Sequence, residues 1–195
     1  MLTGVGGEGV LTAGVLLARA ANLEGHYVRG VQLHGLAQRG GTIPTFVRFG
    51  SEKELSSPGI MQANADLVLA FEPMEAARAV FYARKEKTNF IINDNPHMPV
   101  YANLLDVPYP KMNTIIEKIK PFAKDIHIFK AHEMAKQELG NTIYGNIILI
   151  GAAIGAGFLP LKEKNVKEAI KITVPGDIEA NLKALDIGIK LGKKR

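Results

Sequence analysis

The chain has 195 residues and a formal net charge of +5, a length that predicts one domain spanning residues 1–195. It contains no cysteine, which excludes disulfides, thiolate zinc sites and cysteine-ligated iron–sulfur clusters within this chain. We find no signal peptide, no apolar run long enough to cross a membrane and no basic stripe with interleaved aromatics, so we expect a cytoplasmic protein that binds neither membrane nor nucleic acid.

The first half of the chain alternates between apolar runs and glycine-rich or polar connections. Three residues precede a glycine motif, and an almost wholly apolar stretch follows it. In chain order we expect a helix at 10–23, strands at 27–32 and 45–49, a surface loop at 51–59, a strand at 65–72 and a helix at 73–84.

The second half continues the alternation and ends in helices. We expect a strand at 89–94, an irregular proline-bearing segment at 95–113, a helix within 115–121, a strand at 125–129 and helices at 131–139, 146–158, 163–170 and 177–191. Strands that alternate with helices are typical of an α/β fold. The prediction is a mostly parallel, Rossmann-like sheet with helices on both faces and a helical C-terminal end.

Gly4, Gly6 and Gly9 form a G-x-G-x-x-G motif, which in dinucleotide enzymes cradles a pyrophosphate at a helix N-terminus. A dinucleotide site also needs an acidic residue about 20 positions further on, whereas residues 29–32 are Arg-Gly-Val-Gln. Arg29 keeps an NADP-binding interpretation open, because it could contact a 2′-phosphate. The alternative is that the glycines form only a tight strand–helix turn.

Other polar residues give weaker signals. Glu72 ends an apolar strand, where it either faces the ligand crevice of an α/β sheet or caps the helix that starts at Pro73. His132 opens the sequence HEMAK, which lacks the second histidine of a zincin motif, so we interpret His127 and His132 as structural. The densest polar cluster is residues 32–48, where Arg39 precedes two glycines; it suits either an anion or a protein contact.

Three segments in order, TGVGGEGVLTAGVLLARAA, HGLAQRGGTIPTFVRFG and ADLVLAFEPMEAAR, resemble the gamma subunit or domain of 2-oxoacid:ferredoxin oxidoreductases. A weaker likeness continues through TIYGNIILIGAAIG. Within the family, AQRGG is most similar to the small beta subunit of the indolepyruvate branch, with a pyruvate or other 2-oxoacid gamma subunit as the alternative. The chain departs from the family pattern in its short stretch before the loop and in Glu8, where glutamine is frequent.

The resemblance implies an obligate subunit in the thiamine-dependent, coenzyme-A-linked oxidative decarboxylation of an arylpyruvate, which yields acyl-CoA, carbon dioxide and reduced ferredoxin. It implies that thiamine diphosphate, magnesium and 4Fe–4S clusters reside in a large alpha subunit, which also delivers electrons to ferredoxin, and that this chain binds no cofactor alone. A free-standing NADP-dependent reductase and a non-catalytic scaffold remain the other hypotheses. We assign no catalytic residue; the candidate contacts to substrate, coenzyme A or the partner are Gly6, Gly7, Gly9, His34, Gln38, Arg39, Gly40, Gly41 and Glu72.

Overall fold

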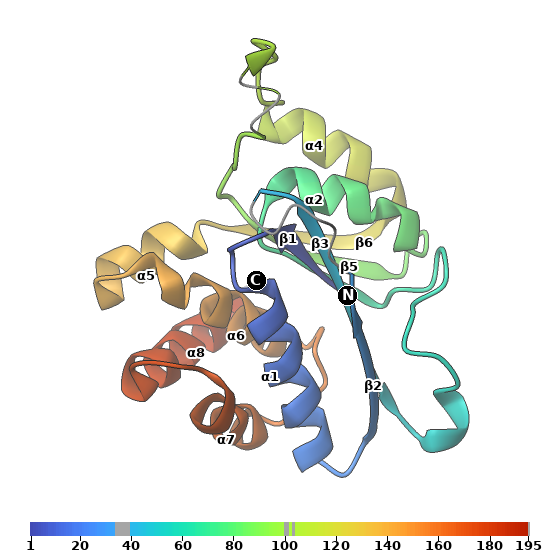
Figure 1. Cartoon of the computed structure of the whole chain (residues 1–195), viewed down its shortest axis with the longest axis vertical. Helices are drawn as coiled ribbons and strands as arrows, with labels where there is room; N and C mark the ends of the chain where they lie inside the picture. Colours follow the sequence, from blue (N-terminus) through green and yellow to red (C-terminus); the bar gives the residue numbers. More distant parts are fainter. Residues whose placement is uncertain (34–39, 100–101, 103, 195) are drawn as a thin grey trace.

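A computed structural model describes residues 1–33, 40–99, 102 and 104–194. Six strands form a sheet in the order β2-β3-β1-β4-β5-β6 (Figure 1). The strands are β1 Leu2–Val5, β2 Tyr27–Gln32, β3 Thr42–Gly50, β4 Leu67–Ala70, β5 Thr88–Asn93 and β6 Ala123–Phe129. His34, Gln38 and Arg39 lie outside the described residues, so their predicted roles stay predictions.

The sheet is mostly parallel, as predicted. Strands β1, β4, β5 and β6 pair in parallel, while β3 runs antiparallel to both of its neighbours, β1 and β2. The insertion of β3 between β1 and β2 departs from the usual dinucleotide fold, in which the first two strands are adjacent. The first strand spans Leu2–Val5, so it includes Gly4 and Val5, which we had assigned to the loop.

Helices cover both faces of the sheet, as predicted (Figure 1). One face carries α2 and α4, and the other carries α1, α5, α6, α7 and α8. The helices are α1 Val10–Leu23, α2 Pro73–Arg78, α4 Met112–Ile119, α5 Ala131–Leu139, α6 Gly145–Gly155, α7 Glu163–Thr173 and α8 Ile178–Lys193. Short 3₁₀ turns are η1 Glu52–Glu54, η2 Ala79–Tyr82, η3 Lys120–Phe122 and η4 Thr142–Tyr144.

The core follows the alternation of side chains along the central strands. Leu69 and Ile91 point toward α1 and α6, whereas Val68 and Phe90 point toward α2 and α4. All four side chains are buried, which explains why these strands read as continuous apolar runs in the sequence.

Helices α6 and α8 pack with their backbones in close contact. A Cβ atom at Gly188 would overlap the carbonyl oxygen of Ile148, and one at Gly192 would overlap that of Ala152. Glycine is therefore required on α8 where it crosses α6, and both residues are buried.

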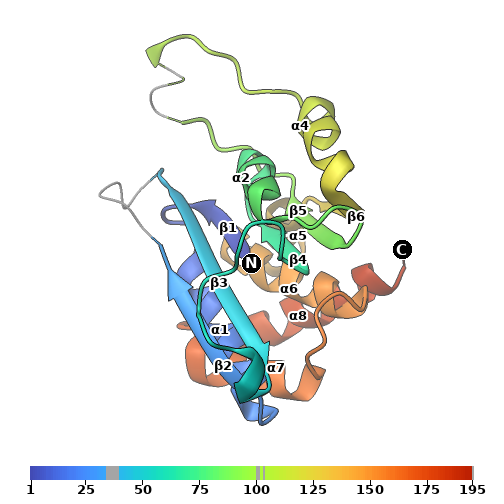
Figure 2. The same ribbon diagram turned by 90° about the vertical axis from the view of Figure 1, so that its right-hand side faces the viewer.

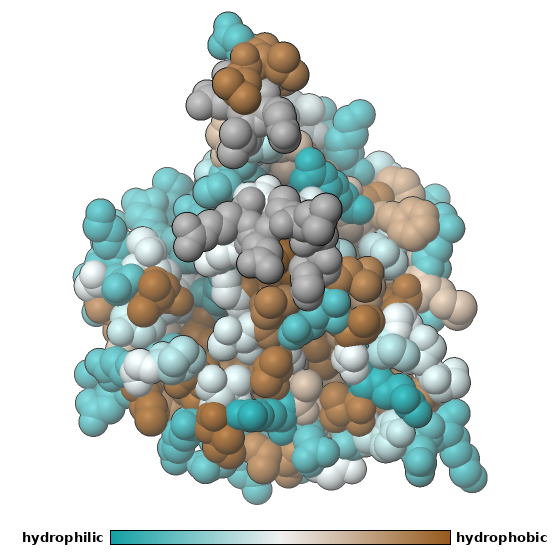
Figure 3. Space-filling model, viewed as in Figure 1, coloured by the Kyte–Doolittle hydropathy of each residue, from teal (hydrophilic) through white to brown (hydrophobic). Residues whose placement is uncertain are grey.

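Several predicted boundaries differ from the structure; for example, the strand expected at 45–49 begins at Thr42, and the helix expected at 146–158 ends at Gly155. The helix expected at 73–84 ends at Arg78 and continues as η2, because Ala83 adopts an extended conformation and bridges to Ala65. The segment expected to be irregular to residue 113 already becomes helical at Met112. Between β5 and α4 the chain projects from the body of the molecule (Figure 2), and Leu104 and Leu105 in this segment are exposed. Apolar side chains gather near the tip of the projection (Figure 3).

Candidate functional site

The glycine loop joins β1 to α1 at the carboxyl edge of the parallel strands. Gly7 has φ 99° and Gly9 has φ 76°, a region that favours glycine. Gly9 is the N-cap of α1, and no side chain caps this helix. The torsions fit the tight-turn interpretation, and they leave backbone N–H groups of the first helical turn without a side-chain acceptor.

The second glycine motif lies directly against the first. The backbone N–H of Gly6 donates to the carbonyl oxygen of Gly41 at 2.8 Å, and the N–H of Gly40 donates to the carbonyl oxygen of Gly6 at 3.2 Å. Five of the candidate contact residues, Gly6, Gly7, Gly9, Gly40 and Gly41, are thus brought to one corner of the molecule. The sequence had placed them in two unrelated loops.

Glu72 caps α2, which confirms the second of its two interpretations. Its Oε2 accepts a hydrogen bond from the backbone N–H of Glu75 at 2.9 Å, and the residue is only 1% exposed. Its Oε1 accepts from the Tyr109 hydroxyl and from the backbone N–H of His97 at 3.3 Å. Glu72 therefore anchors both ends of the projecting segment to the sheet.

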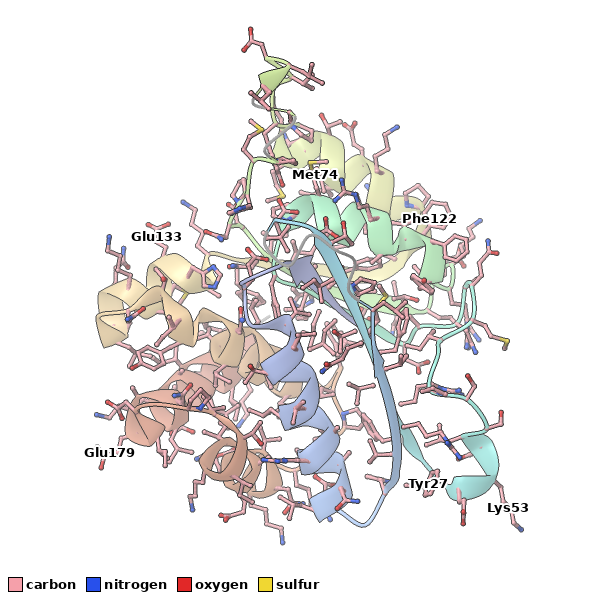
Figure 4. The ribbon with its side chains drawn as sticks, in the orientation of Figure 1. Tyr27, Lys53, Met74, Phe122, Glu133 and Glu179 are labelled. Carbon is pink, nitrogen blue, oxygen red and sulfur yellow. The ribbon has the colours of Figure 1, made fainter. Side chains whose placement is uncertain are left out.

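Tyr109 completes this anchor. Its hydroxyl accepts a hydrogen bond at 3.2 Å from the backbone N–H of Met74, which Figure 4 labels at the start of α2. Burial, followed by the hydrogen bond to the Glu72 carboxylate, raises the pKa of Tyr109, so the phenol stays protonated and keeps donating to Glu72.

Two further carboxylates lie beside Glu72. Glu8 Oε2 accepts from the backbone N–H of Val5 at 2.9 Å, and burial raises the pKa of Glu8 to about 7 despite this bond, with the charges of Glu72 and Glu75 adding to the increase. Glu75 accepts from the Thr42 hydroxyl at 3.1 Å and pairs with Arg78. Its pKa is also raised, because burial outweighs the neighbouring guanidinium. Burial therefore disfavours the ionised form of both Glu8 and Glu75 beside the glycine loops.

His132 is fixed by the end of β5. The amide Nδ2 of Asn93 lies 2.8 Å from His132 Nδ1, and Asn93 Oδ1 accepts from the backbone N–H of Ala131 at 2.9 Å. Since the Asn93 amide nitrogen is a donor, His132 Nδ1 must accept and the ring proton resides on Nε2. Burial lowers the pKa of His132, partly offset by its contact with the Asn146 side chain, so the ring is held neutral.

A cavity of about 510 Å³ lies between the glycine loop and His132. The glycine loop, the first turns of α1 and α6, and His132 line it, and apolar residues such as Ile147 and Val174 form the rest of its wall. Asn146 connects α6 to the glycine loop at the cavity wall, because its Nδ2 donates to the carbonyl oxygen of Glu8. The cavity can therefore offer backbone N–H groups and a neutral imidazole N–H beside an apolar surface.

The sequence interpretation missed Asn93, His132 and Asn146 as parts of this site. A usable signal existed for two of them: Asn93 ends one strand and His132 follows the next, so both reach the carboxyl edge of the sheet. Asn146 gave only a weak signal, as a polar residue at the start of an apolar helix.

The NADP interpretation finds no support in the geometry. Arg29 donates from Nε to the carbonyl oxygen of Leu55 at 2.7 Å and lies over the Tyr27 ring, on the edge strand β2. Because β3 separates β2 from β1, this arginine is distant from the glycine loop in the sheet order.

Neither a metal centre nor a membrane span is found in the part of the chain that the structure describes. Within it, no three His, Asp or Glu side chains gather in a way that could hold a metal ion. No helix of the described residues has the length and apolar character to cross a bilayer.

Comparison with known proteins identifies the protein family to which this chain belongs. The sequence profile described as pyruvate ferredoxin/flavodoxin oxidoreductase matches residues 1–191, and the chain belongs to this family. The indolepyruvate oxidoreductase subunit IorB of Thermococcus kodakarensis is 37% identical, over the whole of this chain and 95% of the relative.

Solved structures show the same fold. The gamma subunit of a keto/oxoacid ferredoxin oxidoreductase from Geobacter sulfurreducens matches with a TM-score of 0.70 at 21% identity, over 100% of this chain and 97% of that one. The 2-oxoglutarate:ferredoxin oxidoreductase of Magnetococcus marinus, solved with 2-oxoglutarate, coenzyme A and succinyl-CoA bound, matches with a TM-score of 0.71 at 19% identity, over 100% of this chain and 30% of that longer one.

Proposed function

We propose that this chain is the small subunit of an indolepyruvate:ferredoxin oxidoreductase. The observation that carries the proposal is the full-length similarity to the IorB subunit, together with the glycine motifs that the fold joins at one corner. Residues 1–195 act as a single gamma-type domain in this proposal, supported by the family match over 1–191. The reaction converts an arylpyruvate, coenzyme A and oxidised ferredoxin to an aryl-acetyl-CoA, carbon dioxide and reduced ferredoxin.

The partner in this proposal is a large alpha subunit that holds thiamine diphosphate, magnesium and 4Fe–4S clusters. Those groups supply the decarboxylation and the electron transfer. The chain itself has no cysteine to ligate a cluster, which supports this division. It would therefore be inactive alone.

In the proposed complex, the residues of this chain bind and orient rather than react. The N–H groups of the glycine loop and of the uncapped α1 terminus suit an anionic group such as a phosphate or a carboxylate. The Nε2–H of His132 would donate to an acceptor on the same bound molecule, and the apolar wall of the cavity would exclude water from it. We assign these contacts to coenzyme A or the 2-oxoacid. Glu72 only positions the projecting segment of this chain between β5 and α4.

The test is a reconstitution with the large subunit and a panel of substrates. Coenzyme-A-dependent reduction of a viologen dye is measured with indolepyruvate, pyruvate and 2-oxoglutarate. We expect the pair to use indolepyruvate with the highest kcat/KM. A preference for pyruvate or 2-oxoglutarate would assign the chain to another branch, and NADPH binding by the lone chain without association would refute the proposal.

A further inference from the structure

The projecting segment between β5 and α4 carries a group of exposed apolar side chains. Leu104 is 74% exposed, Leu105 is 73% exposed and Val107 is 52% exposed. The segment extends away from the body of the molecule in both ribbon views (Figure 1, Figure 2), and apolar side chains gather near its tip (Figure 3). Single exposed leucines are ordinary on a protein surface, whereas apolar side chains grouped at the end of a projection indicate a contact site.

The end of the segment is a closed turn. The backbone N–H of Val107 donates to the carbonyl oxygen of Ala102 at 2.9 Å, and Asp106 has φ 51°. A bond that spans six residues, with a left-handed residue directly before its donor, is the arrangement that ends many helices. Leu104 and Leu105 lie within this turn, which we call the tip turn. Because their backbone is ordered in the free chain, a partner that binds them loses little conformational entropy.

The base of the segment is fixed as well. Glu72 accepts hydrogen bonds from the Tyr109 hydroxyl and from the His97 N–H, so both sides of the segment are attached to the end of β4. Four prolines restrict φ along the segment: Pro96, Pro99, Pro108 and Pro110. The tip turn is therefore presented outward on a stiffened support.

The segment begins beside the cavity of about 510 Å³. Asn95, its first residue, lines that cavity together with Gly7, Gly9 and His132. A molecule that covers the projecting segment is therefore a neighbour of the cavity. In the proposed function, the ligand of the cavity reacts at thiamine diphosphate on the large subunit, so that subunit has to approach this edge of the sheet.

The size of the exposed group favours a large partner over a short peptide. A stable interface buries about 800 Å² on each partner. Two leucines and a valine expose much less area than this, so the partner also has to cover the adjoining carboxyl edge of the sheet. A second copy of this chain over that edge would obstruct the approach of the large subunit to the cavity.

We propose that the tip turn docks into an apolar groove of the large subunit, with Leu104 and Leu105 as its anchors. A few buried anchors supply most of the binding energy of many interfaces, and the surrounding contacts exclude water from them. The projecting segment thereby sets the position of the large subunit relative to the cavity. The inference rests on the proposed function, because that function supplies the partner.

The first test places a carboxylate on the tip turn. Leu104→Asp and Leu105→Asp are compared with Met61→Asp, the matched control, because Met61 is 71% exposed and lies in the loop before β4. Binding of the purified large subunit is measured by biolayer interferometry. We expect each tip variant to raise the Kd at least tenfold and the control to change it less than twofold, with all three lone chains folded by circular dichroism.

Three outcomes would contradict the inference. Equal binding by all three variants would overturn docking of the tip turn and leave the proposed function intact. Self-association of the lone chain that Leu105→Asp abolishes would overturn it in favour of a second copy. A wild-type chain that does not bind the large subunit would refute the proposed function, and the inference with it.

The second test follows the tip turn in the assembled complex. Because the chain contains no cysteine, a single introduced thiol can be followed specifically. Leu105→Cys and the control Met61→Cys react with N-ethylmaleimide with and without saturating large subunit, and mass spectrometry quantifies the modified peptide of this chain. We expect the complex to slow the reaction at least tenfold at Leu105→Cys and to leave the control unchanged. An unchanged rate at Leu105→Cys in a complex that reduces dye with indolepyruvate would overturn the inference.

Discussion

Glu72 offers the sharpest mutational prediction, because three hydrogen bonds converge on one buried carboxylate. Substitution by alanine removes the N-cap of α2, which is worth about 1 kcal/mol. It also removes the acceptor for Tyr109 and for the His97 N–H, at about 1.5 kcal/mol for each bond to a charged group. We therefore expect Glu72→Ala to lower the free energy of unfolding by roughly 4 kcal/mol.

The assay is equilibrium denaturation in urea, combined with limited proteolysis of the projecting segment between His97 and Tyr109. Glu168→Ala is the control, because its carboxylate forms an exposed ion pair with Lys171 at 3.1 Å. We expect the control to change stability by less than about 0.5 kcal/mol. A loss below about 1 kcal/mol for Glu72→Ala, with unchanged cleavage of the segment, would refute the anchoring role.

Three other predictions follow from buried contacts. Gly188→Ala should lower the melting temperature and destabilise the chain by about 2 kcal/mol or more, because its Cβ meets the backbone of α6; a neutral effect in thermal unfolding would contradict that packing. Since the pKa of Glu8 is raised in the fold, its contribution to stability should fall as pH increases from 4.5 to about 7, and Glu8→Gln should flatten this slope in pH-dependent melting curves; an unchanged slope would argue against it. Nitrogen-15 NMR should show His132 neutral at pH 7 with its proton on Nε2, and a protonated Nδ1 would contradict the hydrogen bond from Asn93.

Local patterns were sufficient to predict most of the elements. Residues 27–32 and 131–139 were predicted with the boundaries that the structure shows, because turn residues and apolar periodicity mark both. The place of β3 between β1 and β2 was not predictable, since strand order depends on pairing between distant segments.

The candidate site was only partly accessible from the sequence. The glycine motifs were recognisable, but their mutual hydrogen bonds joined residues more than 30 positions apart. For Glu72, the sequence left two roles open, and the bond from the Glu75 N–H shows the capping role. Its contacts with Tyr109 and His97 were not predictable, because those residues arrive from an irregular segment with no periodic signal. The roles of His34, Gln38 and Arg39 remain predictions.

The central claim is that this chain works only as a subunit of a 2-oxoacid:ferredoxin oxidoreductase. The most direct measurement compares coenzyme-A-dependent dye reduction with indolepyruvate by the co-purified pair, by the large subunit alone and by this chain alone. We predict turnover by the pair and no measurable turnover by this chain, with the large subunit at least tenfold less active than the pair. Equal activity of the large subunit with and without this chain would contradict the account.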